Sequence, residues 1–497
     1  MLVHSFLERT AHDRPDAPAV LHGAEQATYL DVERGANRIA HRLLAAGVHP
    51  GDRVGLLADN SRRYVEAFFG VLKAGGIVVP LNTAAESTLL GALLHDCEAR
   101  ALLVDSGRAD LGARSCVAAT LDPVRAVLPL EPAGEGEAAP PKVARSGQDR
   151  AAIVYTSGST GRPKGAVLRH ANIVANANSI VSYLGLGPAD RMLVVLPFFY
   201  VYGQSLLVTH VAAGASLAIE NRFLFPSVVV DSLARSEATG FAGVPSTFAI
   251  LLHKTDFAQR SFPALRYVTQ AGGAMAPALT QRLIEALPGK QIFVMYGATE
   301  ASARLSFLPP DQLASHLGSI GRAIPGVELR VLREDGSEAA VGEVGEIVAR
   351  GPNIMEGYWG DPEETLRVLD EAGYHTGDLA RRDDSGFLWI VGRKRDMIKA
   401  GAHRISPKEI EEALLEHPGL LEVAVIGVPD EILGEAIEAH VVLRPDASTD
   451  ARQLEAFVRE RLPAYKTPRR FIVHAELPKS AAGKILKDVL RTAPRRP

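Results

Sequence analysis

Cysteine and long apolar runs are the scarcest features of this sequence, and each scarcity excludes a class of protein. Only two cysteines, Cys97 and Cys116, occur in 497 residues, so a disulfide framework is excluded and two reduced thiols are expected. No Cys/His spacing matches a zinc site. No apolar run reaches the ~18 residues of a membrane-spanning helix. Charged residues from Glu8 to Asp13 interrupt any signal-peptide core, so we expect a cytoplasmic protein without integral membrane contact.

A strong excess of charge of either sign is also missing. The 54 basic and 58 acidic residues leave a net charge of −4, which argues against a partner such as nucleic acid or an anionic membrane bound through bulk charge. The apolar share of 47% and the charged share of 23% are ordinary for globular proteins, so a disordered chain is excluded. The length predicts about three domains or subdomains.

Helical and strand-like segments alternate along the first part of the chain. Because helices of about ten residues separate these strands, the pattern predicts an α/β body with parallel sheets and crossover helices. Residues 131–141 (EPAGEGEAAPP) are expected to form an exposed connector. The predicted helices cover residues 5–13, 30–46 and 64–74, and the predicted strands cover 53–57, 77–79 and 151–155.

A second, smaller unit is predicted near the C-terminus. Residues 394–404 are basic and contain glycine, as a hinge would. Ser406-Pro407-Lys408-Glu409 reads as a capping box that opens a helix over 408–416. The fold expected is therefore a large N-terminal α/β body followed by a small α+β domain of about 100 residues. Further strands are predicted over 423–428, 439–443 and 470–474, and a helix over 450–461.

The most informative segment is residues 155–165, YTSGSTGRPKG. Exposed backbone N–H groups, hydroxyls and a lysine after a buried strand are suited to cradle a polyphosphate. The loop is not a Walker A motif, because Lys164 is followed by Gly165 and a strand-like run. By composition alone, a flexible surface loop is as good an interpretation of this segment as a phosphate-binding loop.

The same segment closely resembles the phosphate loop of the adenylate-forming superfamily, which includes acyl-CoA synthetases, aryl-CoA ligases and luciferases. Further stretches resemble the superfamily's other signatures, in its order. Residues 295–300 (MYGATE) are similar to its nucleotide and Mg²⁺ motif, 270–275 (QAGGAM) to its adenine-binding stretch, and 374–378 (YHTGD) to its ribose motif. The resemblance implies that ATP or AMP is bound by Thr156, Ser157, Gly158, Ser159, Thr160, Gly161, Lys164, Gly272, Gly273, Ala274, Tyr296, Gly297, Thr299, Asp378 and Arg393.

Chemistry and resemblance agree on several of these roles. Glu300 is a hard oxygen ligand for Mg²⁺, and the Asp378 carboxylate can accept bonds from both ribose hydroxyls. The competing readings are a solvated glutamate at a strand end and a weak surface ion pair between Asp378 and Arg393. The residues expected to be catalytic are Lys484, Glu300 and Thr160.

The resemblance also implies a mobile C-terminal domain that turns between two half-reactions. Residues 392–405 are similar to the hinge region, with Arg395 at the pivot. The predicted domains are 1–393, a hinge at 394–396, and 397–497, which carries Lys484 in a stretch (478–487, PKSAAGKILK) that resembles the closing signature. Lys399, Gly401 and Ala402 are expected at the thiol-acceptor channel. Ala402 departs from the usual glycine, which weakens the expectation of a thiol acceptor.

The resemblance implies that residues 196–203, LPFFYVYG, belong to the acid-binding pocket, with Tyr200 in place of the superfamily's usual histidine. Members of the superfamily that activate amino acids usually have an Asp here to hold the ammonium group, and none lies within 198–204, so the resemblance argues against an α-amino acid. We expect no buried Arg or Lys for the second carboxylate of a dicarboxylic acid, so a fatty or an aryl acid fits better. A fatty acid is favoured over an aryl acid because Gly and Ala leave depth in the pocket. For any single one of these residues, a role in core packing is as good an interpretation as a role in the acyl pocket. The expected lining is Tyr200, Tyr202, Gly203, Gly243, Val244, Gln270 and Ala271.

Together these features predict an AMP-forming acid–thiol ligase. It would use ATP and Mg²⁺ to form an acyl-adenylate, then transfer the acyl group to coenzyme A or to the pantetheine of a carrier protein. The alternatives are a binding protein with a degenerate ATP site, a luciferase-like oxygenase, and an adenylating enzyme for another kind of acid or a non-thiol acceptor.

Overall fold

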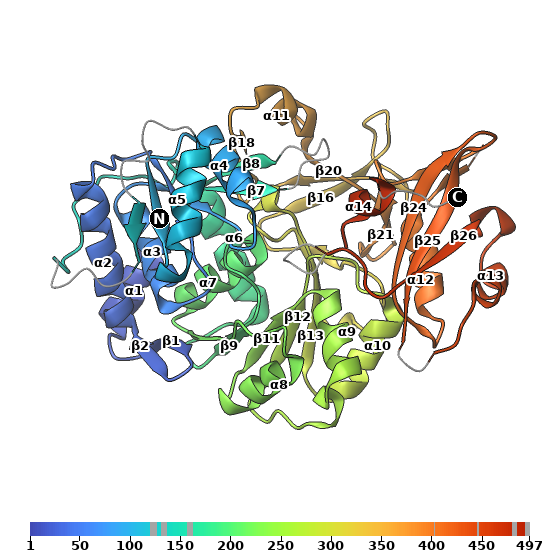
Figure 1. The fold of residues 1–497 in the computed structure, drawn as a ribbon, viewed down its shortest axis with the longest axis horizontal. Coiled ribbons are helices and arrows are strands. Elements are labelled where there is room, and N and C mark those ends of the chain that lie inside the picture. The colour runs from blue at the N-terminus through green and yellow to red at the C-terminus, as the bar shows by residue number, and fades with distance from the viewer. Residues whose placement is uncertain are drawn as a thin grey trace.

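The computed structural model describes residues 1–119, 127–130, 137–156, 163–401, 403–444, 447–479 and 485–492. Two large sheets form the N-terminal body, and two smaller sheets follow them along the chain (Figure 1). Short 3₁₀ helices are η1 (Ser106–Arg108), η2 (Phe257–Gln259), η3 (Thr299–Ala301), η4 (Pro310–Gln312) and η5 (Ala464–Lys466).

The first sheet has nine strands in the order β15-β14-β13-β12-β11-β9-β10-β1-β2. Its central pairs, from β13 across to β1, are parallel, and both ends are closed by antiparallel strands. The strands are β1 (Pro18–His22), β2 (Glu25–Thr28), β9 (Arg191–Val194), β10 (Ser216–Ile219), β11 (Gly240–Gly243), β12 (Tyr267–Gln270), β13 (Gln291–Tyr296), β14 (Ser306–Leu308) and β15 (Arg322–Ala323).

The second sheet has seven strands in the order β18-β8-β7-β4-β3-β5-β6. It is parallel except where β8 pairs with β7 and β18. The strands are β3 (Arg53–Leu57), β4 (Ile77–Pro80), β5 (Ala101–Val104), β6 (Val127–Pro129), β7 (Arg150–Thr156), β8 (Lys164–Arg169) and β18 (Gly357–Tyr358).

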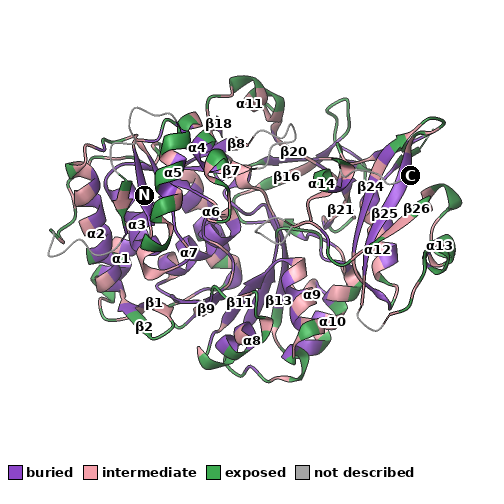
Figure 2. Ribbon diagram, in the orientation of Figure 1, coloured by how far each residue is buried: buried purple, intermediate pink, exposed green. Residues whose placement is uncertain are grey.

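Five helices lie between these two sheets and build the main core. One continuous apolar cluster joins their buried side chains to strands of both sheets, including Leu56 of β3 and Met192 of β9. Figure 2 shows the resulting band of buried residues through the body. These helices are α1 (Ser5–Asp13), α2 (Tyr29–Ala45), α3 (Arg62–Lys73), α6 (His170–Leu184) and α7 (Val201–Ala213).

The remaining helices of the body are peripheral to that layer. A second apolar cluster joins α8, α9 and α10 to the first sheet, and a third joins α4 to the second sheet. They are α4 (Ser87–Asp96), α5 (Ala109–Ala118), α8 (Pro226–Arg235), α9 (Pro245–Lys254) and α10 (Pro277–Ala286).

The third and fourth sheets divide at the predicted hinge. The third has the order β16-β17-β20-β19, with β21 paired to β20, and the fourth has the order β23-β22-β25-β24, with β26 paired to β25. The third contains β16 (Glu328–Leu332), β17 (Gly345–Arg350), β19 (Leu369–Asp370), β20 (Gly373–Arg382) and β21 (Leu388–Arg393), with α11 (Pro362–Val368) beside it. The fourth contains β22 (Ile398–Ala400), β23 (His403–Ile405), β24 (Leu420–Asp430), β25 (Gly434–Leu443) and β26 (Arg470–His474), with α12 (Pro407–Leu415), α13 (Ala451–Arg459) and α14 (Lys487–Thr492).

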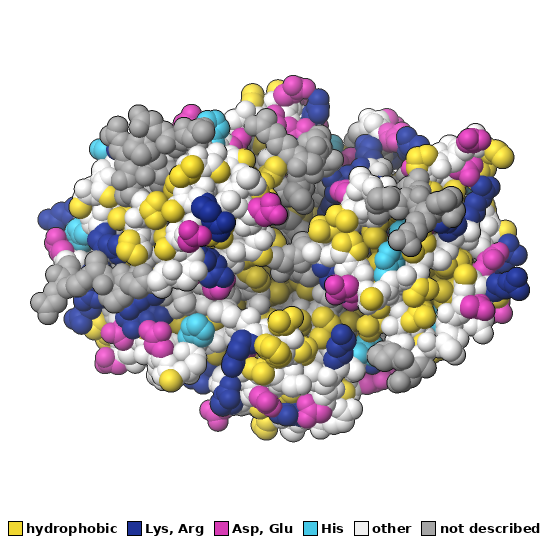
Figure 3. Space-filling view, viewed as in Figure 1, with side chains coloured by type: hydrophobic (Ala, Val, Ile, Leu, Met, Phe, Trp, Pro, Cys, Tyr) yellow, Lys and Arg dark blue, Asp and Glu magenta, His cyan; other side chains and the backbone are white. Residues whose placement is uncertain are grey.

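The predicted helices and strands all occur, and none of their bounds shifts by more than five residues. The predicted capping box at Ser406 is wrong, because its side chain does not cap α12. Ser406 Oγ instead donates to the backbone oxygen of Val391, which ties the start of α12 to β21. No helix of the described residues is long and apolar enough to cross a membrane. Basic and acidic side chains are interspersed on the face shown in Figure 3, as the small net charge leads one to expect.

Candidate nucleotide and acyl site

The predicted site residues of the first sheet gather where its parallel strands end. Gly243 of β11 pairs with Gln270 of β12, and Gln270 pairs in turn with Val294 of β13. The segments that follow these strands therefore meet at one edge of the sheet. This edge, at the carboxyl ends of the strands, is where α/β proteins generally bind ligands.

Close backbone contacts explain two of the glycines at this edge. A Cβ added to Gly297 would lie 1.9 Å from the backbone oxygen of Ala303, and one added to Gly203 would lie 2.0 Å from that of Pro197. Gly272 has φ +83°, which favours glycine. The Gln270 amide donates to the backbone oxygen of Gly273 at 2.8 Å and so holds this turn.

Asp378 is the best-defined charged group of the site. It is 4% exposed and sits on β20, where it pairs in register with Arg393 of β21. Arg393 Nε donates to Asp378 Oδ1 at 2.7 Å, and Tyr296 Oη donates to Oδ2 at 2.7 Å. Burial, together with the Asp378 charge, raises the pKa of Tyr296 well above its ordinary value, so the phenol remains a donor. A carboxylate has about four lone-pair sites, and these two bonds leave capacity for a diol.

Glu300 and Lys164 are both neighbours of one tyrosine, Tyr358. Tyr358 Oη donates to Glu300 Oε1 at 2.8 Å, and Lys164 Nζ lies 5.5 Å from the centre of the Tyr358 ring. Lys164 is ion-paired with Glu364 of α11. In the described part of the chain, no Lys or Arg forms an ion pair with Glu300. Its charge therefore has no cationic partner there, whereas Lys164 must exchange Glu364 for any phosphate it binds.

The hinge and channel residues lie in or before the fourth sheet. Arg395 stands in the turn between β21 and β22, next to Asp396, whose Oδ1 accepts a bond from Arg491 Nη2 of α14 at 3.0 Å. The backbone N–H of Lys399 donates to Glu435 at 2.6 Å, and that of Gly401 donates to the backbone oxygen of Leu433 at 2.8 Å. These bonds place Lys399 and Gly401 at the exposed hairpin of β22 and β23.

Several predicted residues fall outside the part of the chain that the structure describes. Three other predicted residues are described: Thr156 ends β7, Thr299 begins η3, and Ala274 lies in the segment after β12. The residues outside the described ranges are Ser157, Gly158, Ser159, Thr160, Gly161, Ala402 and Lys484.

One expectation about the acyl pocket is wrong. Tyr202 is buried, and its hydroxyl donates to the backbone oxygen of Thr269 at 3.0 Å. Tyr200 precedes α7, and the centre of its ring lies 4.6 Å from that of Phe199. We expected no buried Arg or Lys here. Arg304 is nevertheless 2% exposed, and its guanidinium carbon lies 4.2 Å from the centre of the Tyr202 ring.

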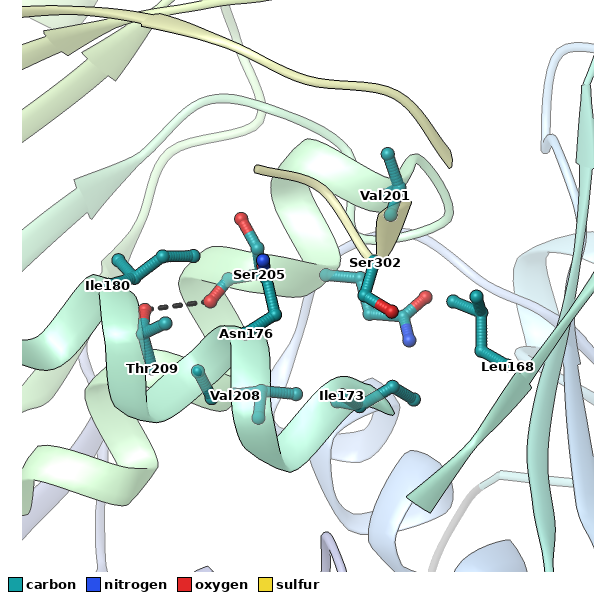
Figure 4. A pocket seen from close by; sticks show the side chains of 11 residues that line it. Leu168, Ile173, Asn176, Ile180, Val201, Ser205, Val208, Thr209 and Ser302 are labelled. Carbon is teal, nitrogen blue, oxygen red and sulfur yellow. Dashed lines mark hydrogen bonds between the residues drawn. The ribbon is translucent and has the colours of Figure 1, made fainter. Parts of the chain in front are cut away.

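A small cavity, with room for about one water molecule, lies between α6 and α7 (Figure 4). It is lined mainly by aliphatic side chains, together with Asn176, Gln204, Ser205, Thr209 and Ser302. Asn176 Oδ1 and Gln204 Oε1 are buried and have no hydrogen-bond partner among the residues that the structure describes. None of the predicted pocket residues lines this cavity. Sequence reasoning missed it because its walls come from two helices whose packing no motif marks.

Comparison with known proteins agrees with this geometry. A family model described as AMP-binding enzyme matches residues 7–359, and one described as AMP-binding enzyme C-terminal domain matches residues 409–484. The chain belongs to the AMP-binding enzyme family. The predicted membership of the adenylate-forming superfamily is thus confirmed, as is the predicted fold class.

Individual relatives of this AMP-binding enzyme match it over nearly its whole length. A protein named feruloyl-CoA synthase, from an Amycolatopsis species, is 35% identical over 491 residues, which cover 98% of both chains. The long-chain-fatty-acid–CoA ligase of Bacillus subtilis (strain 168) is 31% identical over 98% of this chain and 93% of its own. The crystal structure of the anthranilate CoA ligase AuaEII in complex with anthranoyl-AMP has a TM-score of 0.92 and 29% identity, and the match covers 99% of this chain and 97% of that one.

Proposed function

We propose that this AMP-binding enzyme is an AMP-forming acid–CoA ligase. The observation that carries the proposal is Asp378, a buried carboxylate held by Tyr296 and Arg393 at the edge where the predicted nucleotide segments meet. The names of the relatives, which are ligases of ferulate and of long-chain fatty acids, support the same reaction. ATP and coenzyme A are then the substrates besides the acid.

In the first step the acid carboxylate attacks the α-phosphorus of ATP in line, a bond to the carboxylate oxygen forms, and pyrophosphate leaves. Asp378 holds the ribose, and the open backbone at Gly272 and Gly273 accepts the adenine. Positioning of this kind lowers the barrier because the reacting atoms are already aligned. Lys164 leaves Glu364 to bind phosphate oxygens, and Lys484 stabilises the charge that develops during the transfer.

Glu300 fits a magnesium site, because Mg²⁺ is typically held by one or two carboxylates together with substrate phosphates. The described residues contain no cluster of three or more His, Cys, Asp or Glu for an all-protein metal site. Bound there, the ion would neutralise phosphate charge. Tyr358 orients the Glu300 carboxylate through the 2.8 Å hydrogen bond.

In the second step the thiol sulfur attacks the acyl carbon, and AMP leaves with the shared oxygen. We propose that the domain after residue 396 turns at Arg395 for this step, which brings Lys399, Gly401 and Ala402 towards the thiol. Coenzyme A is the acceptor that the relatives' names favour, and a carrier-protein pantetheine has the same thiol chemistry. The enzyme is proposed to act in the cytoplasm.

Acid-dependent pyrophosphate release tests the proposal. Fatty, aryl and amino acids are compared, with coenzyme A added afterwards to trap the thioester. We expect release with at least one carboxylic acid, none with α-amino acids, and a thioester only when coenzyme A is present. ATP binding without release for any acid would leave a binding protein, and oxygen uptake would indicate the luciferase-like alternative.

A further inference from the structure

Arg304 is a buried cation with no anionic partner in the described ranges of the chain. It follows the MYGATE segment by four residues and is 2% exposed. Its Nε donates to Met295 Sδ at 3.3 Å, and its Nη1 donates to the backbone oxygen of Ala303 at 3.1 Å. Among the residues that the structure describes, no Asp or Glu lies within ion-pair distance of it.

These contacts use only part of what a guanidinium offers. Arginine carries five N–H donors, and the thioether sulfur of Met295 is a weak acceptor. The Tyr202 ring supplies a cation–π contact at 4.2 Å, which offsets part of the loss of hydration. A buried charge still requires a paired anion to be stable. The Tyr183 hydroxyl also bonds to Arg304, but it is a neutral group, so the anion that balances this buried charge has to come from a ligand.

The backbone before Arg304 is shaped to turn its side chain inward. Ser302 has φ 55° and Ala303 has φ 111°, conformations that non-glycine residues adopt at a cost and that cluster at binding and active sites. Buried amides hold the turn. Asn353 Nδ2 and Asn176 Nδ2 donate to the backbone oxygen of Arg304 at 2.8 and 3.0 Å.

The guanidinium lies against the predicted acyl pocket. Tyr202, on which it rests, is one of the expected lining residues, and its hydroxyl is bonded to Thr269, next to Gln270 at the end of β12. On its other side, the backbone oxygen of Ala303 packs directly against Gly297 of the nucleotide motif. Arg304 therefore lies beside one predicted pocket residue, Tyr202, and next to the turn that packs on the predicted nucleotide motif.

We propose that Arg304 binds a second carboxylate, so that the acid which this enzyme activates is a dicarboxylic acid. This inference rests on the proposed function and names its substrate class. A carboxylate both neutralises the buried charge and matches the planar N–H pairs of the guanidinium. The methyl end of a fatty acid or an unsubstituted ring would leave that charge unpaired. The distal carboxylate pairs with Arg304, and the other carboxylate reacts with ATP.

Matched pairs of acids test this assignment. Pyrophosphate release is measured for straight-chain diacids of increasing length and for the monoacids of equal length, and likewise for benzene dicarboxylic acids and benzoic acid. At the best length, kcat/KM for the diacid should exceed that for its monoacid by about 10²-fold or more, because sites built around polar groups reject analogues that lack the partner. Equal use of monoacids by the parent enzyme would overturn the proposal.

Substitution of Arg304 separates recognition from folding. Arg304→Met keeps the length of the side chain and removes its charge, so the preference for diacid over monoacid should fall by about 10²-fold, while Arg304→Lys should keep part of it. The control is Arg322→Met, which removes an exposed arginine stacked at 4.1 Å on Phe387 and should leave the preference unchanged. A loss of equal size for both acids in Arg304→Met, with KM for ATP also raised, would mean that Arg304 is structural.

Direct binding distinguishes failure of this inference from failure of the proposed function. If no acid releases pyrophosphate, the proposed function fails, and the inference is then judged by calorimetry with the diacids, with and without ATP. If the parent enzyme binds a diacid and Arg304→Met does not, the result supports the site. If no diacid binds, or if the parent and Arg304→Met bind the diacids equally well, the inference is overturned.

Discussion

Replacement of Asp378 by Asn isolates the charge that we assign to ribose binding. The side chain is 4% exposed, and both of its oxygens accept hydrogen bonds at 2.7 Å. Asn keeps the size and shape of the side chain, but it removes the charge and presents an NH₂ donor to Tyr296 or to Arg393. A hydrogen bond to a charged group contributes about 1.5–3 kcal/mol. The contribution of the Arg393 bond should lie in the lower half of that range, because the Arg393 side chain is 41% exposed and water screens its charge.

ATP affinity should fall more than stability does. Loss of the charged bonds to the ribose should raise the dissociation constant of ATP by about 10²-fold, which is about 3 kcal/mol. The assay is equilibrium binding of ATP, with denaturant unfolding measured in parallel. Tyr296→Phe is the matched control, because it removes one neutral donor and should weaken binding only about fivefold. Unchanged ATP affinity in Asp378→Asn would refute the ribose assignment and leave Asp378 as a structural partner of Arg393.

Three further predictions follow from the same account. Lys484→Ala should lower the rate of acid-dependent pyrophosphate release by about 10²–10³-fold. The same variant should form thioester from a presynthesised acyl-adenylate at close to the parent rate. Equal losses in both assays would mean that no domain turn separates the two steps. Glu300→Gln should raise the Mg²⁺ concentration needed for turnover, whereas Tyr358→Phe, which removes only the hydroxyl bonded to Glu300, should change it less; identical Mg²⁺ curves for Glu300→Gln and parent would exclude Glu300 as a ligand. Burial lowers the pKa of His4 to about 4, so between about pH 6.5 and 4 the unfolded state binds a proton that the folded state does not. As the pH falls through this range, His4 should therefore lower the free energy of unfolding by about 1.4 kcal/mol per pH unit. Urea unfolding at several pH values measures this dependence, which in His4→Leu should be weaker by the equivalent of about one proton.

Elements with a strong local pattern could be predicted from the sequence. The helix over residues 5–13 and the strand over 470–474 occur with the predicted bounds, because each is set by a short apolar pattern. The glycines of the nucleotide segments were also informative. At Gly297 the backbone approach to Ala303 leaves no room for a Cβ.

Features that depend on distant partners were missed. Ser406 has the local signature of a helix cap, yet it bonds to Val391, which belongs to another sheet. The burial of Arg304 depends on a turn of two non-glycine residues with positive φ, held by an amide 128 residues earlier in the chain. No local pattern encodes that pairing, so a charged residue there reads as exposed.

The most direct test of the central claim is the fate of the carboxylate oxygen. An acid labelled with oxygen-18 in its carboxyl group is incubated with ATP, coenzyme A and the enzyme, and the nucleotide product is analysed by mass spectrometry. If an acyl-adenylate forms and a thiol then attacks its acyl carbon, the product is AMP that carries one heavy oxygen. Unlabelled AMP, or ADP accompanied by labelled phosphate, would contradict the account.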